Sequence, residues 1–174
     1  MLALFDAGHD VLFVDEAVFT SKQIQSRVWY FKGEGNVTIP KRALGFKAIA
    51  VVAAIDRNGR VIGLTLADGS IGKHQFRYFI DSCTETRGQR TTHLFLDNLR
   101  LHHMKEIKEY AAQKSMSLWY NAAYSPQLNP IEFLWAYAKR NFKRHCIHEA
   151  DFKNRSKLYR LVREAILDVP ATYL

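Results

Sequence analysis

The chain has 174 residues, of which 48% are hydrophobic, and its formal net charge is +8. This length and apolar content suit one well-cored domain and exclude a disordered chain. Because no run approaches about 18 uninterrupted apolar residues, a membrane span is excluded as well, and the first ten residues lack the pattern of a signal peptide.

The first half of the chain is typical of strands. An apolar run predicts a buried strand over 11–19, and a second strand is expected at Val28–Phe31, before a glycine-rich turn sequence. The stretches Phe46–Ile55 and Arg60–Ala67 flank the residues Asp56-Arg57-Asn58-Gly59, whose composition is that of a hairpin turn. These segments predict an antiparallel meander.

In the second half, helices alternate with strands. The expected elements are a helix around 76–83, a strand at Thr92–Leu96, a helix near Leu101–Lys114, a strand at Ser117–Tyr120, and helices around 131–142 and 149–167. In the Leu101–Lys114 helix, we expect Leu101, Met104, Ile107 and Ala111 to face inward. A meander followed by this alternation predicts a mixed sheet with helices on its faces.

The two cysteines are Cys83 and Cys146, and each lies within a predicted helix. Two cysteines in a chain of this size make no disulfide framework. They indicate a reducing, cytosolic setting in which both thiols fill the core.

Three carboxylates stand where predicted elements end or begin. Asp15 follows the apolar run 11–14, Asp97 follows the similar run 93–96, and Glu132 begins a helix. Like charges brought together repel and shift one another's pKa, and divalent cations that prefer oxygen ligands relieve this repulsion. A two-metal site needs carboxylates from separate elements, so the pattern predicts metal-dependent phosphodiester chemistry.

Each of these carboxylates also has a local structural interpretation, which the residues alone leave open. Asp15 can mark a strand-to-loop boundary, and Asp97 can cap a following helix. Glu132 stands at the third helical position after Asn129 and Pro130, which fits a capping box.

Basic residues gather near the end of the chain. Residues 139–163 hold nine Lys or Arg against two acidic residues, which is typical of a nucleic-acid interface or of a solvated helix face. Lys139 lies two turns after Glu132 on the same face, so we expect a phosphate contact there. The other predicted DNA contacts are Arg140, Lys143 and Arg144.

Three sequence blocks resemble the signature motifs of DDE transposases. They are VLFVDE, HLFLDN followed by His102, and YSPQLNPIEFLWAYAKR, and they are most similar to the mariner-like superfamily of the bacterial insertion sequence 630 type. The 34 residues between Asp97 and Glu132 match the spacing of that group. The resemblance implies that Asp15, Asp97 and Glu132 are the catalytic metal ligands.

The resemblance also implies a fold and supporting roles. We expect an α/β domain over residues 1–174 with a ribonuclease H-like fold, a mixed five-stranded sheet and helices on both faces. Asn98 and His102 are expected to support the site, His102 as a positioning residue rather than a ligand. Trp135 lies in an apolar stripe and is expected to pack in the core rather than stack on a base.

The implied activity is hydrolysis at transposon ends with two Mg²⁺ or Mn²⁺ ions, followed by attack of the freed 3′-hydroxyl on target DNA. The partners are then double-stranded DNA and a second copy of the chain, in the bacterial cytoplasm with the nucleoid. Relatives carry an N-terminal helix-turn-helix region, which we expect to be absent here and supplied by a separate polypeptide. The alternatives are a decayed or domesticated DNA-binding remnant that does not cut, and another ribonuclease H-like nuclease such as a junction resolvase.

Overall fold

The computed structural model describes residues 10–21, 47–88, 90–148 and 154–170, with the side chains of 146–148 left out. The strands are β1 (Asp10–Phe19), β2 (Ile49–Ile55), β3 (Val61–Asp68), β4 (Thr92–Leu96) and β5 (Met116–Tyr120). The helices are α2 (Lys73–Arg87), α3 (Lys105–Gln113), α4 (Ile131–His148) and α5 (Arg155–Leu167), with 3₁₀ turns at Arg100–His103 and Pro126–Leu128.

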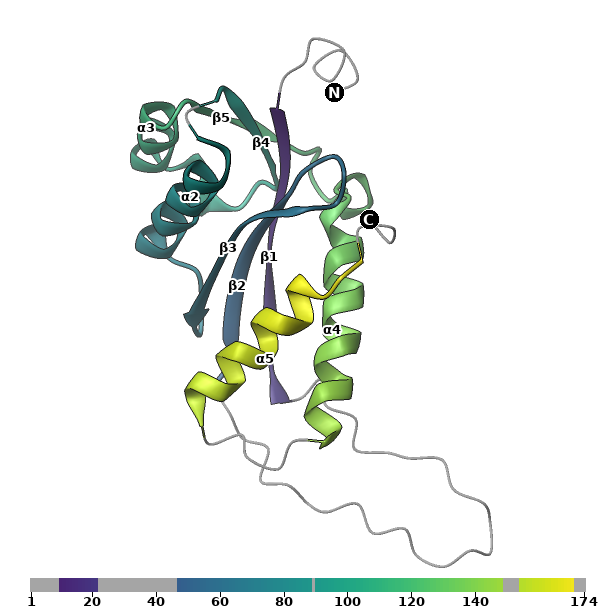
Figure 1. The fold of residues 1–174 in the computed structure, drawn as a ribbon. Coiled ribbons are helices and arrows are strands. Elements are labelled where there is room, and N and C mark those ends of the chain that lie inside the picture. Colours follow the sequence, from purple (N-terminus) through teal and green to yellow (C-terminus); the bar gives the residue numbers. More distant parts are fainter. Residues whose placement is uncertain (1–9, 22–46, 89, 149–153, 171–174) are drawn as a thin grey trace, which may run out of the picture.

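The described strands form one mixed sheet in the order β3-β2-β1-β4-β5 (Figure 1). The hairpin β2–β3 and its neighbour β1 are antiparallel, whereas β1, β4 and β5 run parallel. The parallel connections pass through α2 and α3, as parallel strands require. The prediction of a mixed five-stranded sheet with helices on both faces is confirmed.

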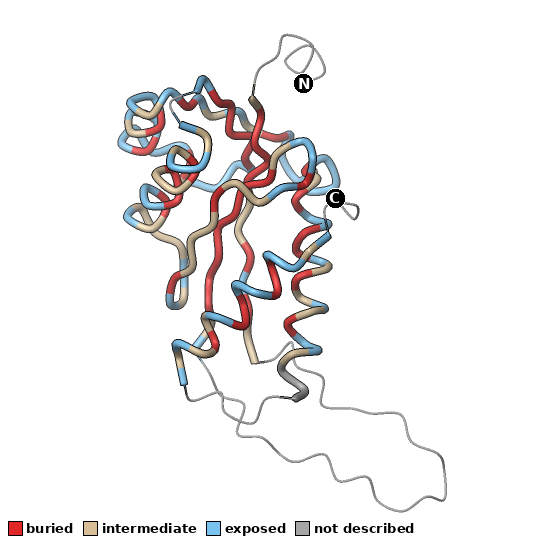
Figure 2. The backbone as a smooth tube through the Cα atoms, viewed as in Figure 1, coloured by how far each residue is buried: buried red, intermediate tan, exposed pale blue. Residues whose placement is uncertain are grey.

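Alternation along β1 divides the interior into two cores, one on each face of the sheet. Phe13 and Phe19 point to the face covered by α4 and α5, while Leu12 and Val14 point to the face covered by α2 and α3. Figure 2 shows the buried residues along the central strands and on the helix sides that face them. Because β1 is covered on both faces, its run 11–14 is continuously apolar.

Two expectations about element boundaries are wrong. The strand predicted over 11–19 is present as β1, but Asp15 lies inside it and not at its end, because antiparallel pairing with β2 continues to Phe19. The expected helix at Leu101–Lys114 is a 3₁₀ turn followed by α3, with an extended backbone at Met104 (ψ 134°) between them. This break resets the helical phase, so Met104 is 39% exposed instead of facing inward.

Other predicted elements match the structure closely. The strand at Thr92–Leu96 has the predicted bounds, and the stripe of Phe76, Phe79, Ile80 and Cys83 is the buried side of α2. Cys83 fills the core as expected, and burial raises the pKa of its thiol to about 12. The strand expected at Val28–Phe31 and residues 149–153 of the last predicted helix lie outside the described residues. In the part of the chain that is described, no helix has the length and apolar character needed to cross a membrane.

Candidate active site

The parallel register of β1 and β4 places Asp15 and Asp97 at the same height along the two neighbouring strands. Phe13 pairs with Phe95 at the last paired position of these strands, and Asp15 and Asp97 each stand two residues further on. Side chains two residues apart in a strand share a face, so Asp15 lies on the same side of the sheet as Phe13. This side is the one that α4 covers.

Glu132 reaches the same place from the first turn of α4. The Nδ2 group of Asn129 donates to the carbonyl of Val14, the residue before Asp15, at 3.0 Å. Since this bond ties the start of α4 to β1, it fixes where Glu132 stands. The Asn129 side-chain oxygen has no hydrogen-bond partner among the described residues, so the capping-box interpretation of Asn129 and Glu132 is wrong.

The three predicted carboxylates line one cavity of about 470 Å³. Its remaining lining comes from the segment after β4 and from the connection between β5 and α4: Asn98, Leu99, Asn121, Ala122, Ala123, Tyr124, Ser125, Pro126 and Asn129. The structure therefore brings together side chains that are up to 117 residues apart in the sequence, from Asp15 to Glu132.

Burial and neighbouring charge set the protonation of Asp15. The pKa of its carboxyl is raised to about 7, chiefly by burial and also by the negative charges of Glu16 and Glu132. The Glu16 backbone N–H and the indole of Trp135 act against this shift, and the Trp135 Nε1–H donates to Asp15 Oδ2 at 2.9 Å. Near neutral pH, Asp15 is therefore only partly ionised, and a bound cation would favour its charged form.

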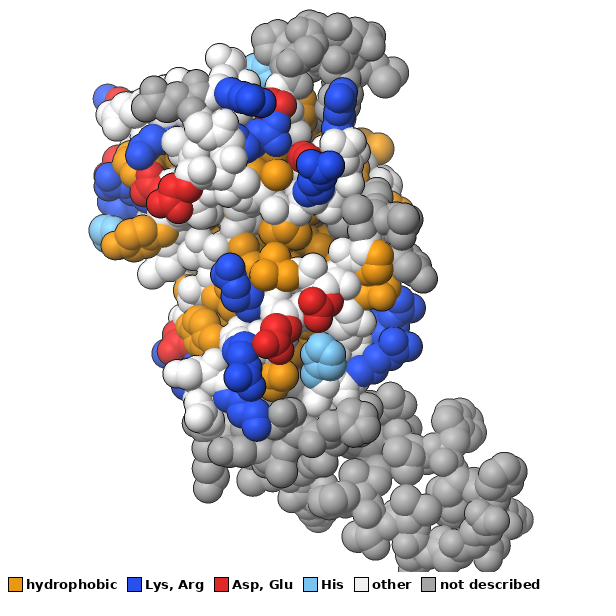
Figure 3. Space-filling view, in the orientation of Figure 1, with side chains coloured by type: hydrophobic (Ala, Val, Ile, Leu, Met, Phe, Trp, Pro, Cys, Tyr) orange, Lys and Arg blue, Asp and Glu red, His pale blue; other side chains and the backbone are white. Residues whose placement is uncertain are grey.

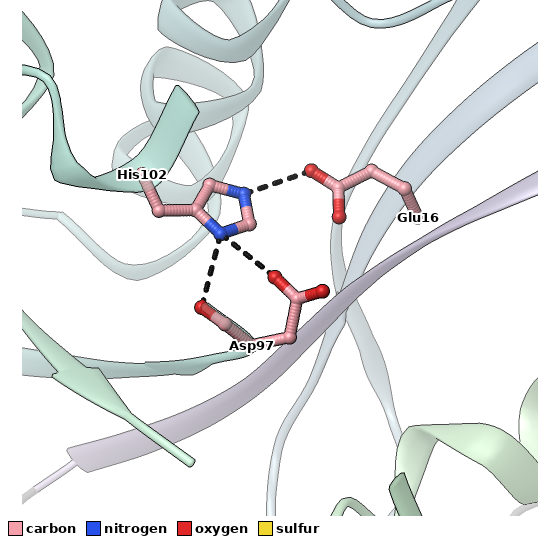
Figure 4. A group of neighbouring side chains, drawn as sticks. All are labelled: Glu16, Asp97 and His102. Atoms are coloured by element: carbon pink, nitrogen blue, oxygen red, sulfur yellow. Dashed lines mark hydrogen bonds and ion pairs between the residues drawn. The ribbon is translucent and has the colours of Figure 1, made fainter. Parts of the chain in front are cut away.

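Asp97 is held by its own turn and by a buried histidine. Its Oδ1 accepts a hydrogen bond from the backbone N–H of Leu99 at 3.0 Å, and lies 3.1 Å from Nδ1 of His102. His102 is fully buried and its Nε2 lies 2.9 Å from Glu16 Oε1 (Figure 4). The helix-cap role considered for Asp97 is wrong, because Leu99 is the N-cap of the following 3₁₀ turn; Asp97 instead holds the turn that leads into it.

The imidazole of His102 lies between two carboxylates, which favour its positively charged form. Burial lowers its pKa, but the hydrogen bond and charge of Glu16, together with Asp97, raise the pKa above its ordinary value. Because the imidazole is held between Glu16 and Asp97, it fixes the orientation of the Asp97 side chain.

Glu16 is the residue of this site to which the sequence analysis assigned no role. The alternation of side chains along β1 could have predicted its position, because residue 16 must face the α2–α3 side of the sheet when Asp15 faces α4. Ligand atoms of Glu16, Asp97 and His102 lie within 4.8 Å of one another, a spacing that a metal ion also accepts. Both ring nitrogens of His102 already have partners, so we interpret this group as an ion-paired support for Asp97 and not as a metal centre.

Two other predicted supporting residues also have defined contacts. Asn98 donates from Nδ2 to the carbonyl of Asn121 at 2.7 Å, which joins the segment after β4 to the end of β5. Trp135 is 2% exposed and packs in the core against α5 and the sheet. The predicted packing role is present, and the hydrogen bond to Asp15 adds a second one.

The four predicted DNA-contacting residues follow one another along α4 and do not line the cavity. Lys139 stands about 10 Å beyond Glu132 along the helix axis and is half-buried, while Arg140, Lys143 and Arg144 are exposed. Figure 3 shows Lys and Arg side chains along this side of the molecule. On α5, by contrast, Arg155 is bound to Asp68 of β3, so the basic face of this helix is partly used within the fold.

We expect Trp135→Phe to weaken divalent-metal binding while the protein stays folded. Phenylalanine keeps most of the buried ring but removes the donor that favours the charged form of Asp15. The loss of a hydrogen bond to a charged group costs about 1–3 kcal/mol, or roughly a 5- to 150-fold loss of affinity. Calorimetric titration with Mn²⁺ measures it.

The matched control is Trp119→Phe, which removes an indole that is 44% exposed and donates to Ser117. This control should bind Mn²⁺ as the wild type does. Equal affinities for all three proteins would show that the Trp135 donor does not tune Asp15.

A sheet of this order, with two aspartates from adjoining strands and a glutamate from a covering helix, defines the ribonuclease H-like class of nucleic-acid-processing domains. A sequence profile of the DDE superfamily endonucleases matches residues 10–158. The chain belongs to this family.

Solved structures of similar fold support the same class. The Mos1 strand transfer complex matches with a TM-score of 0.69 and 15% identity, over 99% of this chain and 52% of that one. The catalytic domain of Mos1 mariner transposase matches with a TM-score of 0.61 and 13% identity, over 99% and 78%. A simian T-cell lymphotropic virus intasome, in complex with PP2A regulatory subunit B56 gamma, matches with a TM-score of 0.63 and 11% identity, over 90% and 47%.

At these identities the likeness establishes the ribonuclease H-like fold and no more. The chain spans about half the length of the Mos1 transposase in the strand transfer complex. No curated protein sequence matches the chain.

Proposed function

We propose that this chain is the catalytic domain of a DDE transposase, which hydrolyses DNA phosphodiester bonds at transposon ends and joins the freed ends to target DNA. The observation that carries the proposal is the single cavity lined by Asp15, Asp97 and Glu132. Membership of the DDE endonuclease family supports the chemistry. Similarity to transposase and intasome structures supports its use in transposition.

The cavity suits hard divalent cations. Its three acidic side chains offer only oxygen ligands, which Mg²⁺ and Mn²⁺ accept. Among the described residues, no Lys or Arg side chain forms an ion pair with Asp15 or Glu132. Structures of the Mos1 catalytic domain have been solved with Mn and with Mg, and we propose two such ions for this chain.

When bound, the cations would supply Lewis acidity for in-line attack on a phosphodiester and for departure of the 3′-oxygen. The protein's own residues hold the ligands in place. Trp135 orients Asp15, His102 and the Leu99 N–H orient Asp97, and Asn129 sets the position of the helix that carries Glu132. The same cavity serves both steps, and no covalent link to the protein is required.

The proposed DNA contact runs along α4. Lys139, Arg140, Lys143 and Arg144 neutralise backbone phosphates beyond the cavity, which gives affinity without sequence information. Recognition of specific ends therefore falls to a helix-turn-helix segment, which we propose is a separate polypeptide. We also propose that two copies assemble on double-stranded DNA in the bacterial cytoplasm, at the nucleoid.

A nicking assay on supercoiled plasmid tests the proposal. The wild type should nick DNA with Mg²⁺ or Mn²⁺, lose this activity in EDTA, and regain it when the cation is restored. Preference for a four-way junction over linear ends would favour a junction resolvase. Binding of DNA that never leads to a nick, with either cation, would favour a non-cutting remnant.

A further inference from the structure

Tyr124 combines full exposure with an unfavourable backbone. The residue is 103% exposed, and its φ of 55° lies in the left-handed region that bulky residues avoid. Within the described residues its ring makes no hydrogen bond, ring contact or ion pair. Neither packing nor a local interaction therefore explains why a large aromatic residue occupies this position, where glycine or asparagine fits with less strain.

The loop that carries Tyr124 is held firmly by Asn121, which is 8% exposed. The Asn121 N–H donates to the carbonyl of Leu96, and its Nδ2 donates to the carbonyl of Ser125, both at 2.7 Å. Its Oδ1 accepts from the Ala122 N–H at 2.8 Å. These bonds connect both ends of the loop to the end of β4, so Tyr124 has a fixed position relative to Asp97.

Tyr124 also lines the cavity that holds Asp15, Asp97 and Glu132. A DNA strand that places a phosphate among these carboxylates lies close to this loop, because residues 121–126 of the loop line the same cavity. A base beside that phosphate can present its flat face to the tyrosine ring only when it is unpaired, at a frayed end or turned out of the duplex. Stacking of this kind tolerates any base, because every base has a π-face.

We propose that Tyr124 is a stacking platform for one unpaired nucleobase next to the phosphate that enters the carboxylate cavity. This inference rests on the proposed function and adds to it a positioning residue that acts on the substrate strand. The stacked base fixes the direction in which the strand enters the cavity. This role would account for the backbone strain at Tyr124, since strain of this kind collects at ligand-contacting positions.

The probe is a 12-nucleotide oligothymidylate with 5-iodouracil at its centre, bound in Ca²⁺ and irradiated so that the modified base cross-links to an aromatic ring stacked on it. In the wild type, mass spectrometry should locate the cross-link at Tyr124. Tyr124→Phe should keep both the cross-link and the affinity. Tyr124→Ala should lose the cross-link and bind about 5- to 150-fold more weakly.

The matched control is Tyr78→Ala, since Tyr78 is 69% exposed on α2 and lies outside the cavity; it should bind as the wild type does. Tyr124→Gly separates stacking from a structural role. Because glycine relieves the strain, its melting temperature should not fall, while its affinity should fall as in Tyr124→Ala.

Three results overturn the inference, and they differ in what else they affect. If the wild type nicks plasmid with Mg²⁺ while Tyr124→Ala binds the oligonucleotide equally well, stacking is wrong and the proposed function stands. If the wild type neither nicks DNA nor binds the oligonucleotide, the proposed function fails and the inference fails with it. A cross-link located only at other residues also overturns stacking at Tyr124.

Discussion

Asp97→Asn is expected to abolish metal-dependent DNA cleavage, by roughly 1,000-fold or more, and to leave the fold intact. The substitution removes one negative charge from the cavity, where stabilisation of the cations and of the transition state amounts to several kcal/mol. Asparagine keeps an oxygen that accepts the Leu99 N–H bond, so the turn after β4 should survive. Plasmid nicking with Mn²⁺ measures the activity, and circular dichroism measures the fold.

The chain offers a matched control in Asp56→Asn. Asp56 also follows a strand and accepts backbone N–H bonds, from Asn58 and Arg60, but it lies in the β2–β3 turn away from the cavity. This variant should cleave as the wild type does. If Asp97→Asn retained the wild-type rate, the assignment of the cavity as the active site would be wrong.

Asp15→Asn is expected to stabilise the metal-free protein at neutral pH while it abolishes activity. The pKa of Asp15 is raised from 3.8 to about 7 in the folded state, so between these values the folded state keeps a proton that the unfolded state releases. The stability of the wild type therefore falls through this group as pH rises from about 4 to about 7. Asparagine carries no charge and avoids this loss.

The advantage of Asp15→Asn should grow across that pH range and then stay constant, at about 1–3 kcal/mol. This range lies below the roughly 4 kcal/mol that a shift of about 3 pH units implies at roughly 1.4 kcal/mol per unit, because asparagine replaces a carboxylate oxygen that accepts the Trp135 hydrogen bond. Urea unfolding in EDTA at pH 4.5, 6 and 8 measures the difference. Added Mn²⁺ should stabilise the wild type and not the variant, since only the wild type keeps the full ligand set.

A variant that is less stable than the wild type at pH 8 in EDTA would contradict the raised pKa of Asp15. Equal stabilisation of both proteins by Mn²⁺ would instead show that Asp15 is not a ligand. The two measurements therefore test the electrostatics of the cavity and its metal-binding role separately.

Patterns of apolar residues were sufficient to predict most elements of the described fold. The strand at Thr92–Leu96 and the buried stripe of α2 appear as predicted, because burial on a regular element leaves a period in the sequence. The helix near Leu101–Lys114 was placed too early, because the extended backbone at Met104 leaves no such period. The conformation of this one residue sets where α3 begins and which of its side chains face the core.

For the candidate site, motifs in the sequence were enough to single out the acidic residues. The motifs around Asp15, Asp97 and Glu132 identified the acidic residues that line one cavity. Their catalytic and metal-binding roles remain predictions that the variants above test.

The contacts that support these residues become visible only in the folded chain. The pairing of Glu16 with His102, and the bonds from Trp135 to Asp15 and from Asn129 to Val14, join residues 86 to 120 positions apart. Contacts of this range depend on strand register and helix packing, which no local pattern records. The positive φ of Tyr124 and the exposure of its side chain likewise follow from the fold. The φ of one residue is set by the contacts that close its loop.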